Sequence, residues 1–75
     1  MTIVLKRRTT TEYLDDQDNW TPQRGDARCF SDSVTAMRYG VEKGFYEAEM
    51  VFEFEDPSWN FQIPIAAVFT AAITR

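Results

Sequence analysis

Residues 46–56, with the sequence YEAEMVFEFED, alternate between apolar and acidic side chains. Successive side chains of a β-strand point to opposite faces, so this segment predicts a strand with two unlike sides. The apolar side would carry Tyr46, Ala48, Met50, Phe52 and Phe54. The acidic side would carry Glu47, Glu49, Glu53 and Glu55, interrupted by Val51. We expect the apolar side to line the core and the acidic side to face solvent.

Shorter patterns predict the elements that precede this strand. β-prone residues at 3–5, 13–14 and 27–30 predict three short strands, and the polar run 15–19 predicts a loop. Trp20 follows that loop, and we expect it to fold back onto the core.

A helix is expected after residue 30, because Ser31 or Asp32 can accept a hydrogen bond from the first free N–H groups of a helix. Apolar residues follow at helical spacing and would face inward: Val34, Met37 and Val41. Gly44 can adopt the left-handed conformation that ends a helix.

The chain after the acidic strand predicts the second half of a hairpin. Asp56-Pro57-Ser58 has turn chemistry, and residues 59–63 alternate as a returning antiparallel strand would. Trp59 would either be exposed at the hairpin tip or pack against the small core. Residues 65–75 fit a short helix and an extended segment equally well.

Together these elements predict an α+β fold, a small antiparallel β-sheet with one helix packed on one face. Residues 1–75 are expected to form a single domain with a thin core. No apolar run approaches the roughly 18 residues of a membrane span, so we expect no membrane contact.

Composition narrows the possible functions. A net charge of −4 disfavours direct binding of nucleic acid and suits either a basic protein partner or simple solubility. The chain has no histidine, the commonest general base and metal ligand, so we expect no enzyme and no cofactor. The single cysteine, Cys29, cannot form an internal disulfide, which predicts a reducing, cytoplasmic location. We expect Cys29 to be buried as a small apolar side chain.

The acidic side of the strand is the first candidate binding surface. Its carboxylates would lie roughly 6–7 Å apart, close to the spacing of phosphates along a nucleic-acid strand. No lysine or arginine occurs between Lys43 and Arg75 to offset their repulsion. The row would therefore suit a basic partner. Alternatively, Lys6, Arg7 and Arg8 would neutralise it from a neighbouring strand.

A second acidic cluster precedes Trp20 and consists of Glu12, Asp15, Asp16 and Asp18. Its spacing does not fit a calcium-binding loop, which needs a glycine at its sixth position and a glutamate at its twelfth. We expect a solvated loop and no metal site. Asp15, Asp16 and Asp18 would extend the acidic binding surface, and an exposed Trp59 would anchor a partner beside it.

The chain also resembles small single-domain proteins encoded in phage and bacterial genomes. The resemblance covers residues 12–40 and rests on Tyr13-Leu14, Trp20-Thr21, Ala27 to Phe30 and Ala36. These are core and turn positions, so the resemblance implies a fold and no activity. In size and acidity the chain is similar to phage-encoded inhibitors of bacterial defence, including anti-CRISPR proteins.

The sequence thus predicts a non-catalytic binding protein that occupies a basic, nucleic-acid-binding surface of a target protein. Its carboxylates would stand where phosphates sit. The alternative is a small structural or accessory domain that self-associates through a sheet edge.

Overall fold

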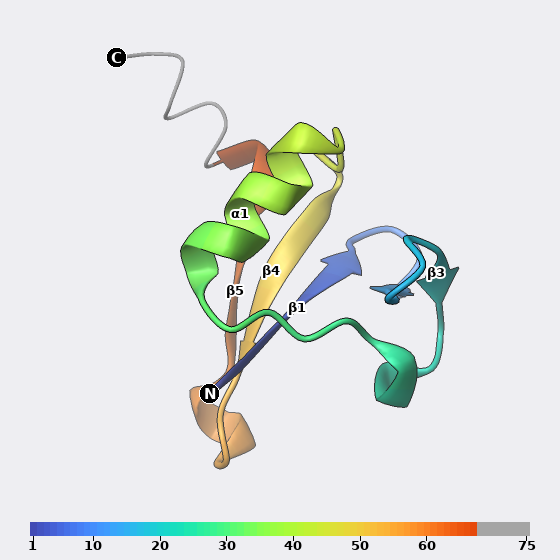
Figure 1. The fold of residues 1–75 in the computed structure, drawn as a ribbon. Helices are drawn as coiled ribbons and strands as arrows, with labels where there is room; N and C mark the ends of the chain where they lie inside the picture. The colour runs from blue at the N-terminus through green and yellow to red at the C-terminus, as the bar shows by residue number, and fades with distance from the viewer. Residues whose placement is uncertain (68–75) are drawn as a thin grey trace.

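The computed structural model describes residues 1–67, and these form an antiparallel sheet with one helix on one face (Figure 1). The sheet has the order β3-β2-β1-β4-β5. Its strands are β1 (Thr2–Arg7), β2 (Tyr13–Leu14), β3 (Trp20–Thr21), β4 (Ala48–Glu53) and β5 (Phe61–Pro64). The helix is α1 (Ser33–Glu42), and two short 3-10 turns are η1 (Arg24–Asp26) and η2 (Pro57–Trp59). The predicted α+β fold is confirmed.

The centre of the sheet joins the beginning of the chain to its acidic strand. β1 pairs antiparallel with β4, with Thr2 opposite Glu53 and Lys6 opposite Glu49. Strands β4 and β5 then form the predicted hairpin, with Phe52 opposite Phe61. Because β1 is the neighbour of β4, its basic residues lie beside the glutamates.

The core lies between α1 and one face of the sheet. Alternation along β4 is as predicted, because Ala48, Met50 and Phe52 are buried. Both ends of the predicted apolar side differ: Tyr46 is 43% exposed and Phe54 is half-buried. Tyr46 lies in the turn before β4, where side chains no longer follow the alternation of a strand.

Helix α1 begins and ends as predicted, and Met37 and Val41 pack against the core as expected, but Val34 does not. Asp32 caps it by accepting a hydrogen bond from the Thr35 N–H at 2.8 Å, and Gly44 follows it with a φ of 74°. The fully buried positions are Ala36 and Gly40, whereas Val34 is 55% exposed. Small residues at the contact let the helix approach its neighbours closely, which turns Val34 outward.

The second face of the sheet has a small buried patch of its own. Val4 is fully buried but points away from Ile3 and Leu5, which belong to the main core. Val51 lies directly opposite Val4 on β4. Burial on this face means that something besides α1 covers the sheet.

Two segments differ from prediction or extend it. Residues 27–30 form no strand and make only isolated bridges, Ala27 to Asp15 and Phe30 to Ile3. Residues 65–67 are helical, which resolves the first part of the 65–75 segment, and residues 68–75 lie outside the described residues.

Candidate protein-binding site

The predicted acidic row is paired with arginines along most of its length. Glu47 lies 3.2 Å from Arg7 Nε, and Glu49 lies 3.9 Å from Arg8 Nε. The side chain of Glu49 is only 12% exposed. Arg7 ends β1 and Arg8 follows it, so two of the three expected cations, Lys6, Arg7 and Arg8, neutralise the row from the neighbouring strand and the turn after it.

Glu53 is neutralised by an arginine that the sequence analysis did not single out. Arg24 Nε lies 3.0 and 2.9 Å from the two carboxylate oxygens of Glu53, and its Nη2 also donates to Oε1. This hydrogen bonding raises the pKa of Arg24. The guanidinium also faces the Tyr13 ring, 5.9 Å from its centroid. Arg24 therefore links Glu53 of β4 to Tyr13 of β2, the two strands that flank β1.

Of the predicted acidic row, only Glu55 is left without an ion pair to the described residues. It lies just beyond the end of β4 and is exposed. Three of the four glutamates thus serve the packing of the sheet, and the phosphate-like row is not a free array of charge.

The second acidic cluster stabilises the loop that carries it. Asp15 accepts hydrogen bonds from the backbone N–H groups of Gln17 and Asn19 at 2.9 and 2.8 Å. Asp16 lies 3.8 Å from Arg28 Nε, and Glu12 pairs with Arg7 at 3.4 Å. These contacts close the loop on itself and on the adjacent strand, in keeping with the expected loop role.

Asp18 fastens the same loop to the end of α1. It accepts a hydrogen bond from the hydroxyl of Tyr39 and lies 3.4 Å from Arg28 and 3.6 Å from Lys43. The Tyr39 hydrogen bond and the two cations hold the pKa of Asp18 below its usual value, and the same bond raises the pKa of Tyr39. Arg28 and Lys43 also face the Tyr39 ring, with 4.8 and 5.6 Å to its centroid. Asp15, Asp16 and Asp18 are therefore engaged within the chain.

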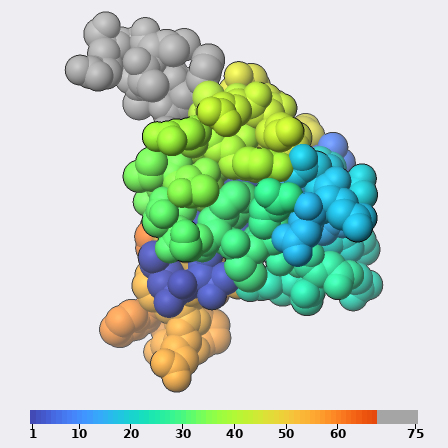
Figure 2. Space-filling model, in the orientation of Figure 1, coloured from blue at the N-terminus to red at the C-terminus, as the bar shows by residue number. Residues whose placement is uncertain are grey.

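Trp59 lies at the end of the hairpin and is 70% exposed, which decides between the two possibilities left open for it. Figure 2 shows this end of the hairpin, in orange, projecting from the body of the molecule. Phe61 beside it is 45% exposed, and Met1 is 70% exposed. Large apolar side chains therefore gather where the acidic row ends.

The hairpin end is held in one shape by its own hydrogen bonds. Asp56 Oδ1 accepts from the N–H and the hydroxyl of Ser58 at 3.0 and 2.8 Å, which lowers the pKa of Asp56. Asn60 Oδ1 accepts from the N–H of Phe54 at 2.7 Å, across the turn. These contacts fix η2 and hence the backbone that carries Trp59.

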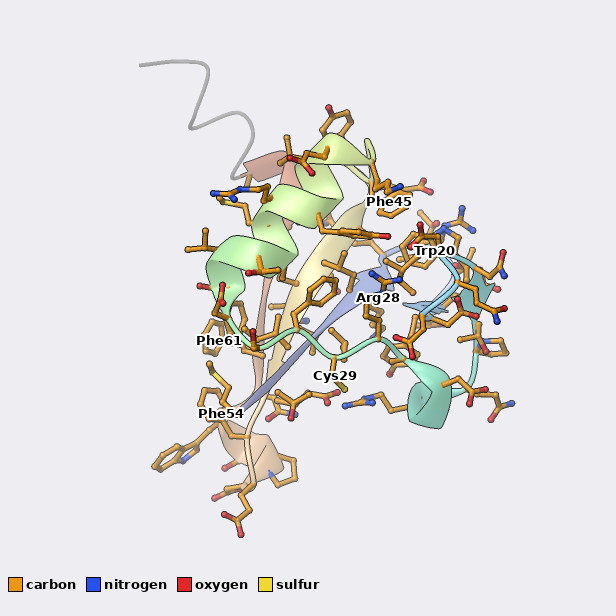
Figure 3. All side chains as sticks on the ribbon, in the orientation of Figure 1. Trp20, Arg28, Cys29, Phe45, Phe54 and Phe61 are labelled. Atoms are coloured by element: carbon orange, nitrogen blue, oxygen red, sulfur yellow. The ribbon has the colours of Figure 1, made fainter. Side chains whose placement is uncertain are left out.

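Stacked rings connect the hairpin end to the core. Phe61 stacks on buried Phe52 with ring centroids 4.5 Å apart, and Phe54 lies 6.0 Å from Phe61 (Figure 3). We call the group formed by half-buried Phe54 and exposed Met1, Glu55, Trp59 and Phe61 the tip surface. This group continues the core beyond the end of α1, where the helix no longer covers it.

Phe61 and Met1 were not singled out from the sequence, although element lengths contain a signal for them. A helix of ten residues covers about 15 Å, whereas the segment from Ala48 to Phe54 covers about 23 Å. The apolar side of the hairpin is therefore longer than the helix that covers it. Its uncovered end must lie in solvent or on a partner.

Cys29 is exposed, so the prediction that it is buried was wrong. It lies on the irregular connection between η1 and α1, where Phe30 points into the core and its neighbour points out (Figure 3). The segment is not a strand inside the sheet, which removes the physical basis of the prediction.

Within residues 1–67, no three Cys, Asp or Glu side chains are grouped as a metal site requires. No helix in the same range has the length and apolar character needed to cross a membrane.

Comparison of the chain with models of protein families, with curated proteins and with solved structures finds no match.

Proposed function

We propose that the protein is a non-catalytic binding protein whose contact surface is the tip surface. Its partner is a protein with a basic surface. The observation that carries the proposal is Trp59, 70% exposed on a hydrogen-bonded turn that projects from the body. Tryptophan is enriched, with tyrosine and arginine, among the few interface residues that contribute most of the binding energy.

Charge favours a basic partner. The whole segment between Lys43 and Arg75 contains no cation, and Glu55 has no ion pair among residues 1–67. A Lys- or Arg-bearing surface would meet a complementary potential there, which speeds encounter and selects among partners.

An inhibitor of a nucleic-acid-binding protein, as phage-encoded anti-CRISPR proteins are, is the form of this function that the acidic composition favours. Such an inhibitor would exclude nucleic acid by covering a basic surface. The pairing of Glu47, Glu49 and Glu53 with arginines gives little support to a phosphate-by-phosphate imitation. A cytoplasmic location is part of the same proposal, because one cysteine cannot form an internal disulfide.

Self-association through a sheet edge has less support. β5 is a four-residue edge strand that ends in Pro64, which has no N–H. Pro64 lies opposite Glu49 and cannot donate, so this is a pair without hydrogen bonds across the hairpin. The two kinds of pair alternate along antiparallel strands, so Ile63 and Phe61 form the hydrogen-bonded pairs with β4. Only Gln62 then turns its N–H to the free edge, and so short an edge is a poor template for another strand.

The proposal is tested by affinity capture from a bacterial lysate with three immobilised proteins. These are the wild type, Trp59→Ala, and Tyr46→Ala as an exposed aromatic control away from the tip. We expect a captured protein that Tyr46→Ala retains and Trp59→Ala loses. A purified target should then be saturated near one equivalent. An effect on that target that grows with time at a hundredth of an equivalent would indicate catalysis and contradict the proposal.

A further inference from the structure

We infer that the partner surface is an apolar slot that receives the Trp59 side chain and has one lysine or arginine at its rim, facing Glu55. The inference rests on the proposed function and names the chemistry of its partner. The inferred partner surface differs from one covered with cations, because most of the binding energy would come from the indole of Trp59.

The number of free charges at the tip limits what charge can contribute. Glu53 is neutralised by Arg24, whereas Asp56 keeps its charge but uses Oδ1 to accept the hydrogen bonds of Ser58 that shape the turn. Among residues 1–67, Glu55 is the carboxylate of the hairpin end that makes neither an ion pair nor a turn hydrogen bond, so it is the one left to meet a cation of a partner. One exposed ion pair contributes only modestly to affinity, whereas a buried tryptophan contributes much more.

The backbone of the tip supports an anchor mechanism. Hydrogen bonds from Ser58 to Asp56 and from Phe54 to Asn60 close the turn on both sides of Trp59. The stacking of Phe61 on Phe52 continues this rigidity into the core. A side chain held in place before binding loses less conformational entropy when it is immobilised.

A second copy of the chain fits the tip less well than a cationic partner does. Met1, Trp59 and Phe61 are 70%, 70% and 45% exposed. With about 150–250 Å² for each aromatic side chain, they offer less than the roughly 800 Å² per partner of a stable interface. Pairing two tips would also bring their Glu55 carboxylates together. A concave slot encloses more of a projecting indole and supplies the opposite charge.

The first experiment asks whether the tip is free in the isolated protein. In Trp20→Phe, Trp59 is the one remaining tryptophan and reports on the tip by fluorescence. We expect the emission of a tryptophan exposed to water, with efficient quenching by acrylamide. Sedimentation velocity should show a monomer up to millimolar concentration. Phosphatidylcholine vesicles should leave the emission unchanged. A protected indole, a dimer lost in Trp59→Ala, or a blue shift with vesicles would each overturn the inference.

The second experiment identifies the preferred ligand with a phage-displayed library of random 16-residue peptides. Selection on the wild type should enrich sequences that combine aliphatic or aromatic residues with one or two lysines or arginines. Trp59→Ala should weaken the selected peptides about 30-fold or more. Glu55→Gln should weaken them about 2–5-fold, as expected for one exposed ion pair.

The outcomes separate this inference from the proposed function. Suppose that peptides rich in Lys and Arg bind Trp59→Ala as well as they bind the wild type. That result would agree with the proposed basic partner but would overturn the inference that Trp59 is the anchor. A fall in affinity of more than about 100-fold between 0.05 and 0.5 M salt would also overturn it, because one ion pair cannot give so steep a dependence. If no peptide binds in a tip-dependent way, both proposals fail.

Discussion

Arg24 and Glu53 are 29 positions apart in the sequence, and their side chains form a bidentate ion pair on the face of the sheet opposite α1. The Arg24 guanidinium faces the Tyr13 ring of β2 and neutralises a glutamate of β4, the two strands that flank β1. The pair therefore links both neighbours of the central strand and occupies one member of the acidic row.

Removing the charge of Glu53 should destabilise the protein more than removing that of Glu55. Glu53→Gln leaves the Arg24 guanidinium without its anion, and we expect a loss of about 1–2 kcal/mol in unfolding free energy. Glu55→Gln should change it by less than about 0.5 kcal/mol. Urea unfolding of the two variants measures both values. Equal values would show that the Arg24–Glu53 pair contributes nothing to stability.

The two sides of β4 should respond differently to substitution. Phe52 is 6% exposed and stacks on Phe61, so Phe52→Ala should cost about 3–5 kcal/mol, enough to unfold a domain of this size. Val51→Thr, on the half-buried second side, should cost under about 1 kcal/mol. Circular dichroism with urea titration compares them. A similar loss for both would contradict the assignment of the sides.

Gly40 is required by close packing against Ile65. A Cβ at position 40 would lie 2.8 Å from Ile65 Cδ1 and 3.1 Å from its Cγ1, and Ile65 is fully buried. Alanine normally gains about 1 kcal/mol over glycine within a helix, but this overlap should make Gly40→Ala destabilising by about 1 kcal/mol or more. Ile65→Val removes Cδ1, so it should cost less in the Gly40→Ala background than in the wild type. A double-mutant cycle with no coupling would refute the contact.

Acid should destabilise the fold through its capping and pairing aspartates. Hydrogen bonds from Tyr39 to Asp18, from Thr35 to Asp32 and from Ser58 to Asp56 lower the pKa of each carboxyl below 3.8. Their stabilisation is complete above that unfolded value, because the folded and unfolded chains are then equally deprotonated. It is lost as the pH falls below about 4 and through the folded pKa values, where the unfolded chain binds more protons.

Urea midpoints measured from pH 6 to pH 2.5 give this dependence. Asp18→Asn should reduce the midpoint at pH 6 because the ion pairs are lost, and should flatten its fall in acid because asparagine does not titrate. Asparagine tolerates the positive φ of 62° at this position, so the substitution should add no backbone strain. An Asp18→Asn profile parallel to that of the wild type would show that Asp18 is not linked to stability.

Cys29 should react with iodoacetamide in the folded protein, because its side chain is exposed. Cys29→Ala should change the unfolding free energy by less than about 0.5 kcal/mol, since it removes no core contact. Mass spectrometry at fixed times, with and without urea, compares the alkylation rates. Protection that disappears only on unfolding would place the thiol in the core after all.

Local sequence patterns predicted the helix and most of the strands. Contacts between residues that are distant in sequence decide which side chains of the acidic row are paired. The alternation at 48–52, the Asp32 cap and the Gly44 stop depend on neighbours within a few positions, so the sequence displays them directly. The Arg24–Glu53 pair depends on where an irregular segment crosses the sheet, and no periodicity encodes that path.

The same distinction explains the errors at Val34 and Cys29. Val34 has helical spacing, but the small side chains of Ala36 and Gly40 are what fit against the neighbouring elements. Cys29 stands in an apolar stretch that bridges to other strands only at its ends, so alternation does not apply to it. The exposure of Trp59 follows from the short helix and the long hairpin together.

The position of β1 has a consequence for how the chain folds. β1 lies in the middle of the sheet, and its register with β4 joins residues 2–7 to residues 48–53. A growing chain can pair its central strand only with the two-residue β2 until the hairpin has been synthesised, so contacts that are distant in sequence must form before the core can close. We therefore expect folding slower than that of a helical domain of equal length, with the β4-facing edge of β1 unpaired until β4 has been synthesised.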